Sequence, residues 1–84
     1  MYYIKNLIHH YYNNGDAESY SATIYNDKES LDVIFSQGGN NFVAYEPKTN
    51  LIYHLSVADN ISTLADFKDG DELDIITEIK ESRL

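Results

Sequence analysis

Hydrophobic and polar residues alternate in pairs at the start of the chain. Across residues 3–14 two apolar residues are followed by two polar ones, three times over. At 100° per residue the apolar positions fall on one half of a helical wheel, and Gly15 then stands where a C-cap glycine belongs. This pattern predicts a helix over residues 3–14. The alternative is the first strand of a hairpin, because Tyr, Ile, Asn and His are mediocre helix formers and Asn14-Gly15 is a strong hairpin signal.

The next two segments carry β-type and mixed patterns. Residues 19–25 are rich in aromatic and β-branched side chains, which predicts a strand. Asn26 and Glu29 have capping-box spacing, and apolar residues then share a helical face up to Gly38-Gly39, which favours a second short helix. A strand is the alternative there, since Leu31, Val33 and Phe35 also alternate.

The second half of the chain predicts a hairpin, a helical turn and a strand. Residues 41–46 and 51–57 flank Pro47-Lys48-Thr49-Asn50, which is a turn sequence. Asp59-Asn60 is suited to cap one helical turn through Ile61, Leu64 and Phe67. After the turn at residues 69–71, residues 72–80 alternate as the clearest strand. Together these elements predict an α+β fold, a small antiparallel β-sheet of about four to five strands with one or two short helices on one face, in a single compact domain over residues 1–84.

Charge is the strongest statement of the composition. Six basic and 14 acidic residues give a formal net charge of −8, and the last third of the chain is the acidic pole. This charge opposes direct binding to nucleic acid or to anionic membranes, which both need a basic surface. The chain has no cysteine, no signal-peptide pattern and no apolar run longer than four residues. We therefore expect a cytoplasmic protein without disulfides or a membrane span.

No motif in the sequence predicts catalysis. His9 and His10 are adjacent, so a zinc site would need one of them together with His54 and a carboxylate; we favour surface histidines instead. An EF-hand alignment that places Gly70 at its glycine position leaves two of the first three ligand positions without a carboxylate. No serine stands in a nucleophile-elbow context. We therefore expect no enzyme activity, no cofactor and no metal.

The leading functional hypothesis is an acidic surface at the C-terminal end that docks on a basic site of a partner protein. A nucleic-acid-binding protein is the expected kind of partner, and phage-encoded inhibitors of bacterial defence enzymes, including anti-CRISPR proteins, are an analogy in size and charge alone. The opposite interpretation is a solvated edge strand whose charges discourage aggregation. The candidate partner-binding residues are Asp66, Asp69, Asp71, Glu72, Asp74, Ile76, Glu78 and Glu81, with Glu72, Asp74 and Glu78 expected on one side of the last strand.

A second hypothesis is self-association as a homodimer or small structural subunit. The N-terminal segment offers a broad apolar stripe for this contact. Its candidate residues are Tyr3, Leu7, Ile8, Tyr11 and Tyr12. A third hypothesis, from a different class, is a small metal-dependent enzyme that uses His54 and nearby carboxylates.

Overall fold

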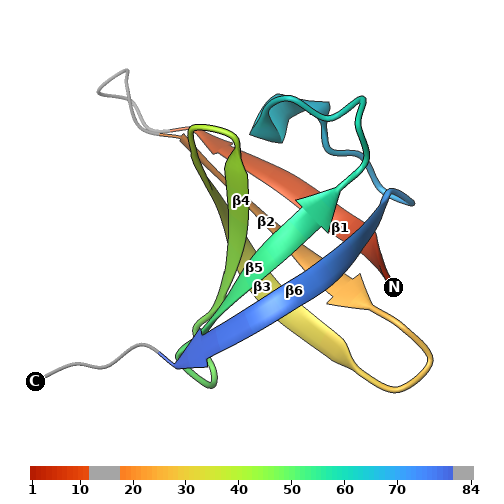
Figure 1. Cartoon of the computed structure of the whole chain (residues 1–84), viewed down its shortest axis with the longest axis vertical. Coiled ribbons are helices and arrows are strands. Elements are labelled where there is room, and N and C mark those ends of the chain that lie inside the picture. The colour runs from red at the N-terminus through yellow and green to blue at the C-terminus, as the bar shows by residue number, and fades with distance from the viewer. Residues whose placement is uncertain (12–17, 81–84) are drawn as a thin grey trace, which may run out of the picture.

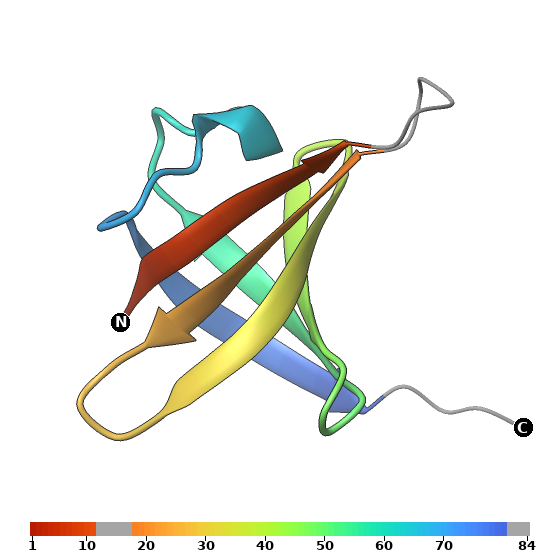
Figure 2. The ribbon, with the colours of Figure 1, turned by 180° about the vertical axis from the view of Figure 1, so that it is seen from behind.

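Strands that follow one another in sequence lie next to one another in space. The computed structural model describes residues 1–11 and 18–80, and its six strands pair antiparallel in chain order until the last returns to the first, which closes a barrel (Figures 1 and 2). The elements are β1 (Tyr2–Tyr11), β2 (Glu18–Tyr25), β3 (Ser30–Gly38), β4 (Asn41–Glu46), β5 (Leu51–Val57), the 3-10 turn η1 (Leu64–Asp66) and β6 (Glu72–Lys80).

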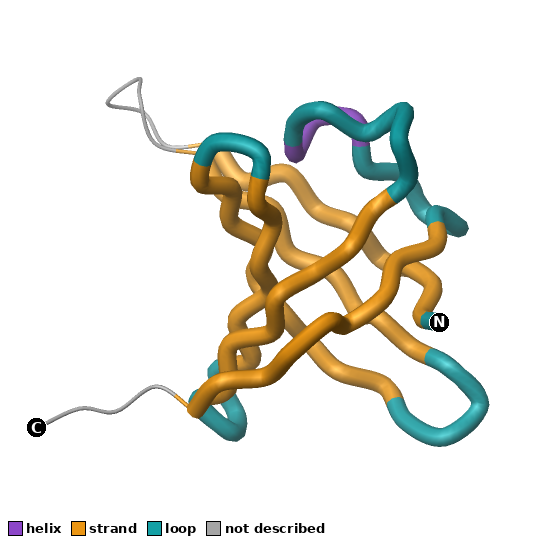
Figure 3. Tube along the Cα trace, viewed as in Figure 1, coloured by secondary structure: helices purple, strands orange, loops and turns teal. Residues whose placement is uncertain are grey.

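The barrel interior is filled by alternate residues of every strand. On β3 the alternation is regular, with Leu31, Val33 and Phe35 buried and their neighbours exposed, as expected for a sheet with one face in the core. The segment between β5 and β6 adds Ile61 and Phe67, and the Phe67 ring lies 4.8 Å from the Phe35 ring. This cap segment, residues 58–71, lies over one end of the barrel (Figure 3), and its Ile61 and Phe67 side chains are buried there.

The α+β prediction was wrong, because the described residues form six strands and only one 3-10 turn. The helix expected over residues 3–14 is strand β1 as far as Tyr11, and the remainder lies outside the described residues. A β-bulge explains the error. Asn6 and Leu7 together oppose the single residue Ala22, and Asn6 adopts φ 56°. The extra residue moves Leu7 to the inner face with Ile4, which produces a helix-like spacing within a strand.

The second expected helix is also a strand. The residues from Ser30 to Gly38 form β3 and pair with β2 and β4. Asn26 does accept hydrogen bonds from the backbone N–H groups of Lys28 (2.8 Å) and Glu29 (3.0 Å), as a helix N-cap would. Here the same bonds close the β2–β3 turn, since an asparagine side chain stabilises turns and helix starts by the same chemistry.

The other expected elements are confirmed. Strands β2 and β6, the β4–β5 hairpin and the helical turn after residue 60 all form. The expected cap at Asp59-Asn60 was wrong, because Thr63 caps the turn, in a capping box with Asp66. No helix in the described part of the chain has the length and apolar character needed to cross a membrane.

The barrel closes through a short seam. Only Tyr2 and Tyr3 of β1 pair with β6, opposite Leu73 and Glu72. The turn before β6 extends this contact, because the backbone N–H of Ile4 donates to the carbonyl of Asp71 (3.0 Å). Beyond the seam β1 and β6 diverge, so that each has one paired side and one unpaired side in the described structure.

The positive φ of Asn6 gives a direct test of the bulge. A β-branched side chain is strongly disfavoured at positive φ, whereas glycine is not. We expect Asn6→Val to lower the free energy of unfolding by about 1 to 2 kcal/mol and Asn6→Gly to change it by less than about 0.5 kcal/mol. Chemical denaturation of both variants measures this difference. Equal stability of the two variants would contradict the strained bulge.

Candidate functional site

Five of the predicted partner-binding residues lie on the cap segment and the start of β6, between residues 66 and 74. Asp66, Asp69 and Asp71 belong to the cap segment, and Glu72 and Asp74 lie at the start of β6, where β6 pairs with β1 (Figure 1). We call this surface the acidic seam and define it as Asp66, Asp69, Asp71, Glu72 and Asp74.

Two carboxylates of the acidic seam hold the cap segment in place. Asp66 accepts hydrogen bonds from the backbone N–H groups of Ser62 (2.8 Å) and Thr63 (3.0 Å). These bonds favour the ionised carboxylate and lower the pKa of Asp66. Asp69 accepts a hydrogen bond from the backbone N–H of Leu7 at 2.9 Å, which joins the cap to β1 at its bulge.

The remaining members of the acidic seam line the closure itself. Asp71 accepts a hydrogen bond from the backbone N–H of Lys68 at 2.9 Å, and Asp74 lies 3.3 Å from the N-terminal ammonium group. Glu72 stands opposite Tyr3, and its exposed side chain makes no hydrogen bond or ion pair with any described residue. The acidic seam therefore consists of carboxylates that are mostly fixed by backbone contacts yet reach solvent.

The other three candidates do not join the acidic seam. Ile76 is the extra residue of a second bulge, because Ile75 opposes Leu55 while Thr77 opposes the preceding residue of β5. This bulge moves Glu78 to the inner face, opposite the buried Tyr53, so the expected shared side for Glu72, Asp74 and Glu78 was wrong. Glu81 lies outside the described residues.

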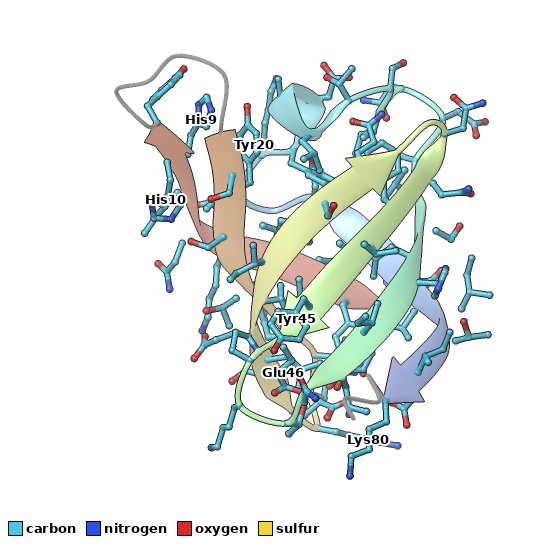
Figure 4. The ribbon with its side chains drawn as sticks, turned by 90° about the vertical axis from the view of Figure 1, so that its left-hand side faces the viewer. His9, His10, Tyr20, Tyr45, Glu46 and Lys80 are labelled. Carbon is cyan, nitrogen blue, oxygen red and sulfur yellow. The ribbon has the colours of Figure 1, made fainter. Side chains whose placement is uncertain are left out.

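A tyrosine–glutamate cluster at the other end of the barrel was not predicted. Glu46 is only 6% exposed and accepts hydrogen bonds from the hydroxyls of Tyr53 (2.9 Å) and Thr49 (2.6 Å) (Figure 4). Tyr2 donates a hydrogen bond to Glu29 across the β2–β3 turn. Burial raises the pKa of Tyr53, with the Glu46 contact as the next cause, and the hydrogen bond to Glu29 raises the pKa of Tyr2 to about 12. The signal for this cluster in the sequence is the alternation of Phe42, Ala44 and Glu46, which puts the glutamate on the same face as two apolar residues.

The histidines do not gather at one place. The His9 ring stacks on the Tyr20 ring with 4.2 Å between the ring centroids, and its centroid lies 3.9 Å from that of the Tyr11 ring. His10 shares a 2.9 Å hydrogen bond with the hydroxyl of Ser21 (Figure 4). His54 lies on β5, opposite Val43 and Thr77. Within residues 1–11 and 18–80, no three His, Asp or Glu side chains are placed to hold a metal ion together.

The predicted self-association residues are divided between the two faces of β1. Tyr3 and Ile8 are exposed on the outer face, and Tyr3 packs at 5.9 Å against Tyr25. Leu7 packs against the core, and Tyr11 contacts His9, which stacks on a core tyrosine. Tyr12 lies outside the described residues. The bulge therefore splits the expected apolar stripe.

The contact between Asp69 and β1 predicts a stability difference between two acidic residues of the cap. Asp69→Ala leaves the Leu7 N–H without its acceptor, so we expect the free energy of unfolding to fall by about 1 to 2 kcal/mol. Asp59→Ala removes an exposed carboxylate with no side-chain contact among the described residues, and we expect a change within about 0.5 kcal/mol. Thermal or denaturant unfolding of both variants makes the comparison, and equal effects would exclude a specific role for Asp69.

The tyrosine–glutamate cluster predicts a loss of stability in alkaline solution. The pKa of Tyr2 is about 12 in the folded protein and about 10 in the unfolded chain, so the folded state holds this proton more tightly. The resulting stabilisation is complete below about pH 10 and disappears as the pH rises towards 12. Phenolate absorbance during a pH titration measures the shift, with Tyr2→Phe identifying the residue. In Glu29→Gln we expect the Tyr2 pKa to move back towards 10; an unchanged value would contradict the proposed cause.

Comparison with known proteins adds no relative. No protein-family model matches the chain, and no curated protein or solved structure matches it either. The functional argument therefore starts from the charge, contacts and exposure of the residues described above.

Proposed function

We propose that this chain is a non-enzymatic binding protein whose acidic seam docks on a basic site of a partner protein. The observation that carries the proposal is the concentration of charge at one end of the barrel. Residues 58–74 contain six carboxylates, namely the acidic seam and Asp59, against the single base Lys68. The cap segment carries four of these groups and the start of β6 carries the other two.

The carboxylates of the acidic seam are suited to binding because most of them are already ordered. Backbone N–H groups hold Asp66, Asp69 and Asp71, so little side-chain entropy is lost when a partner is bound. The lowered pKa keeps Asp66 charged as the pH falls. A carboxylate oxygen has two lone pairs, so these groups retain acceptor capacity for a Lys or Arg side chain.

A nucleic-acid-binding protein is the kind of partner that fits this surface. Such a protein presents a basic site, and the field of the acidic seam would steer association towards it. Alternate residues of a strand stand about 7 Å apart, while duplex DNA carries one charge per about 1.7 Å of its axis. The carboxylates of the acidic seam are therefore too sparse to imitate the duplex closely, and the expected effect is competition for part of the basic site.

Charge reversal at Glu72 of the acidic seam and at Asp59 of the cap segment, which hold no backbone group among the described residues, tests the docking surface. In Asp59→Lys/Glu72→Lys the carboxylates that hold the fold remain, so the protein should fold and lose its basic partner. We expect the unaltered chain, immobilised in a lysate of its source organism at low salt, to capture a basic protein that is released at about 0.5 M NaCl. Added duplex DNA should compete with the immobilised chain for the captured protein and release it.

The matched control reverses the same number of charges at the other end of the barrel. Asp27 lies in the β2–β3 turn and Glu78 on the far half of β6, so Asp27→Lys/Glu78→Lys should retain the partner. Equal loss in both double variants would mean that net charge alone governs capture. Retention of the partner by the Asp59/Glu72 variant, or capture that resists salt, would exclude docking through the acidic seam.

A further inference from the structure

Strand β6 has a long unpaired edge. One side of β6 pairs with β5 from Leu73 to Lys80, but the other side pairs with β1 only at Glu72 and Leu73. On this second side, the backbone from Asp74 to Lys80 therefore pairs with no strand of the described structure. Such an edge presents unpaired N–H and C=O groups in the spacing that another strand needs.

The side chains along this edge are exposed and partly apolar. All five residues from Ile76 to Lys80 are exposed, with Ile76 at 64% and Ile79 at 52%. Ile79 also ends an outer row of apolar side chains that crosses the sheet, because each member stands opposite the next in the strand pairing. The row consists of Ile34, Tyr45, Ile52 and Ile79. An apolar row that continues to an open edge is typical of a contact surface.

We propose that the free edge of β6 pairs antiparallel with the same edge of a second copy of this chain. Counting the bulge at Ile75–Ile76 as one position, the stretch from Asp74 to Ile79 has Thr77 at its centre. A two-fold axis through Thr77 pairs this whole stretch with itself and stops where β1 begins. A closed, isologous dimer results, with a sheet that continues from one barrel into the other.

Charge favours this antiparallel arrangement over other pairings. The free edge begins at the acidic Asp74, two residues after Glu72, and ends at the basic Lys80. Antiparallel self-pairing lays the basic end of one copy beside the acidic start of the other, twice by symmetry. Parallel pairing would instead place like charges together, which is destabilising between neighbouring strands.

The dimer has a salt dependence opposite to that of the acidic seam. Each copy carries a net charge of −8, so general repulsion opposes association and added salt screens it. Pairing along one short strand buries less area than a standard interface, which indicates a weak dimer. Association should therefore become measurable at protein concentrations up to about 1 mM and at about 0.5 M NaCl.

Sedimentation equilibrium across these conditions is the first test. We expect the mass to rise from 9.6 kDa towards twice that value as protein and salt concentrations increase. Ile79→Asp should weaken dimerisation by at least about tenfold, because in this register residue 79 stands opposite Asp74 of the second copy and two carboxylates would face each other. Ile8→Asp is the matched control: Ile8 is also 52% exposed and on the outer face, but on β1, so this variant should dimerise as the unaltered chain does.

A single introduced cysteine tests the register. The chain contains no cysteine, so Thr77→Cys carries the one thiol, and directly opposed residues of antiparallel strands lie within disulfide distance. We expect mild oxidation to convert Thr77→Cys to a covalent dimer, whereas Ser36→Cys, exposed on the outer face of β3, should stay monomeric.

Two outcomes would overturn the proposal. A monomer at every concentration and salt would mean that the bulge, Glu78 and Lys80 protect the edge from pairing. A dimer that is weakened by Ile8→Asp and not by Ile79→Asp, or that crosslinks equally at positions 36 and 77, would place the contact elsewhere. Neither result bears on the acidic seam, because its partner is lost through Asp59 and Glu72 and not through Ile79.

Discussion

The closure of β1 on β6 is the constraint on which the remaining structure depends. Six consecutive antiparallel strands form a barrel only if the last one returns to the first, and here two residue pairs make that contact. The turn before β6 strengthens the closure through backbone bonds to Ile4 and the Asp69 carboxylate bonded to Leu7. Because the contact is so short, each of the two strands keeps an unpaired half. The same closure therefore brings the carboxylates together and leaves the β6 edge open.

Two β-bulges decide which side chains meet solvent. Each inserts one residue and exchanges the inner and outer faces of the strand beyond it. On β1 the bulge at Asn6 keeps Ile4 and Leu7 both on the core side. On β6 the bulge at Ile76 separates Glu78 from Asp74 and turns it towards Tyr53. The strong curvature of a small barrel needs such kinks, so local irregularity in these strands is a condition of closure.

The acidic residues of the cap combine a structural and an electrostatic role. A carboxylate that accepts backbone N–H bonds stays charged, and its remaining lone pairs face solvent. The cap contains little regular secondary structure, so its backbone N–H groups need acceptors of this kind. High negative charge at this end therefore stabilises the fold locally while it produces the field that we propose is used for binding. The tyrosine–glutamate cluster at the opposite end has a different character, because its carboxylates are paired with hydroxyl donors.

Several elements followed from local sequence alone. The β4–β5 hairpin, β2, β6 and the capped turn depend on alternation and on turn residues that act within a few positions of one another. The acidic pole likewise follows from composition. Local sequence alone did not predict β1 and β3 as strands. In β1 a bulge imitates helical spacing, and before β3 Asn26 closes a turn with the hydrogen bonds of a helix cap. Only the tertiary structure decided these segments, the face on which Glu78 lies and the partners of Tyr2 and Glu46. Each depends on which residue stands opposite in a neighbouring strand, and that pairing joins positions far apart in the chain.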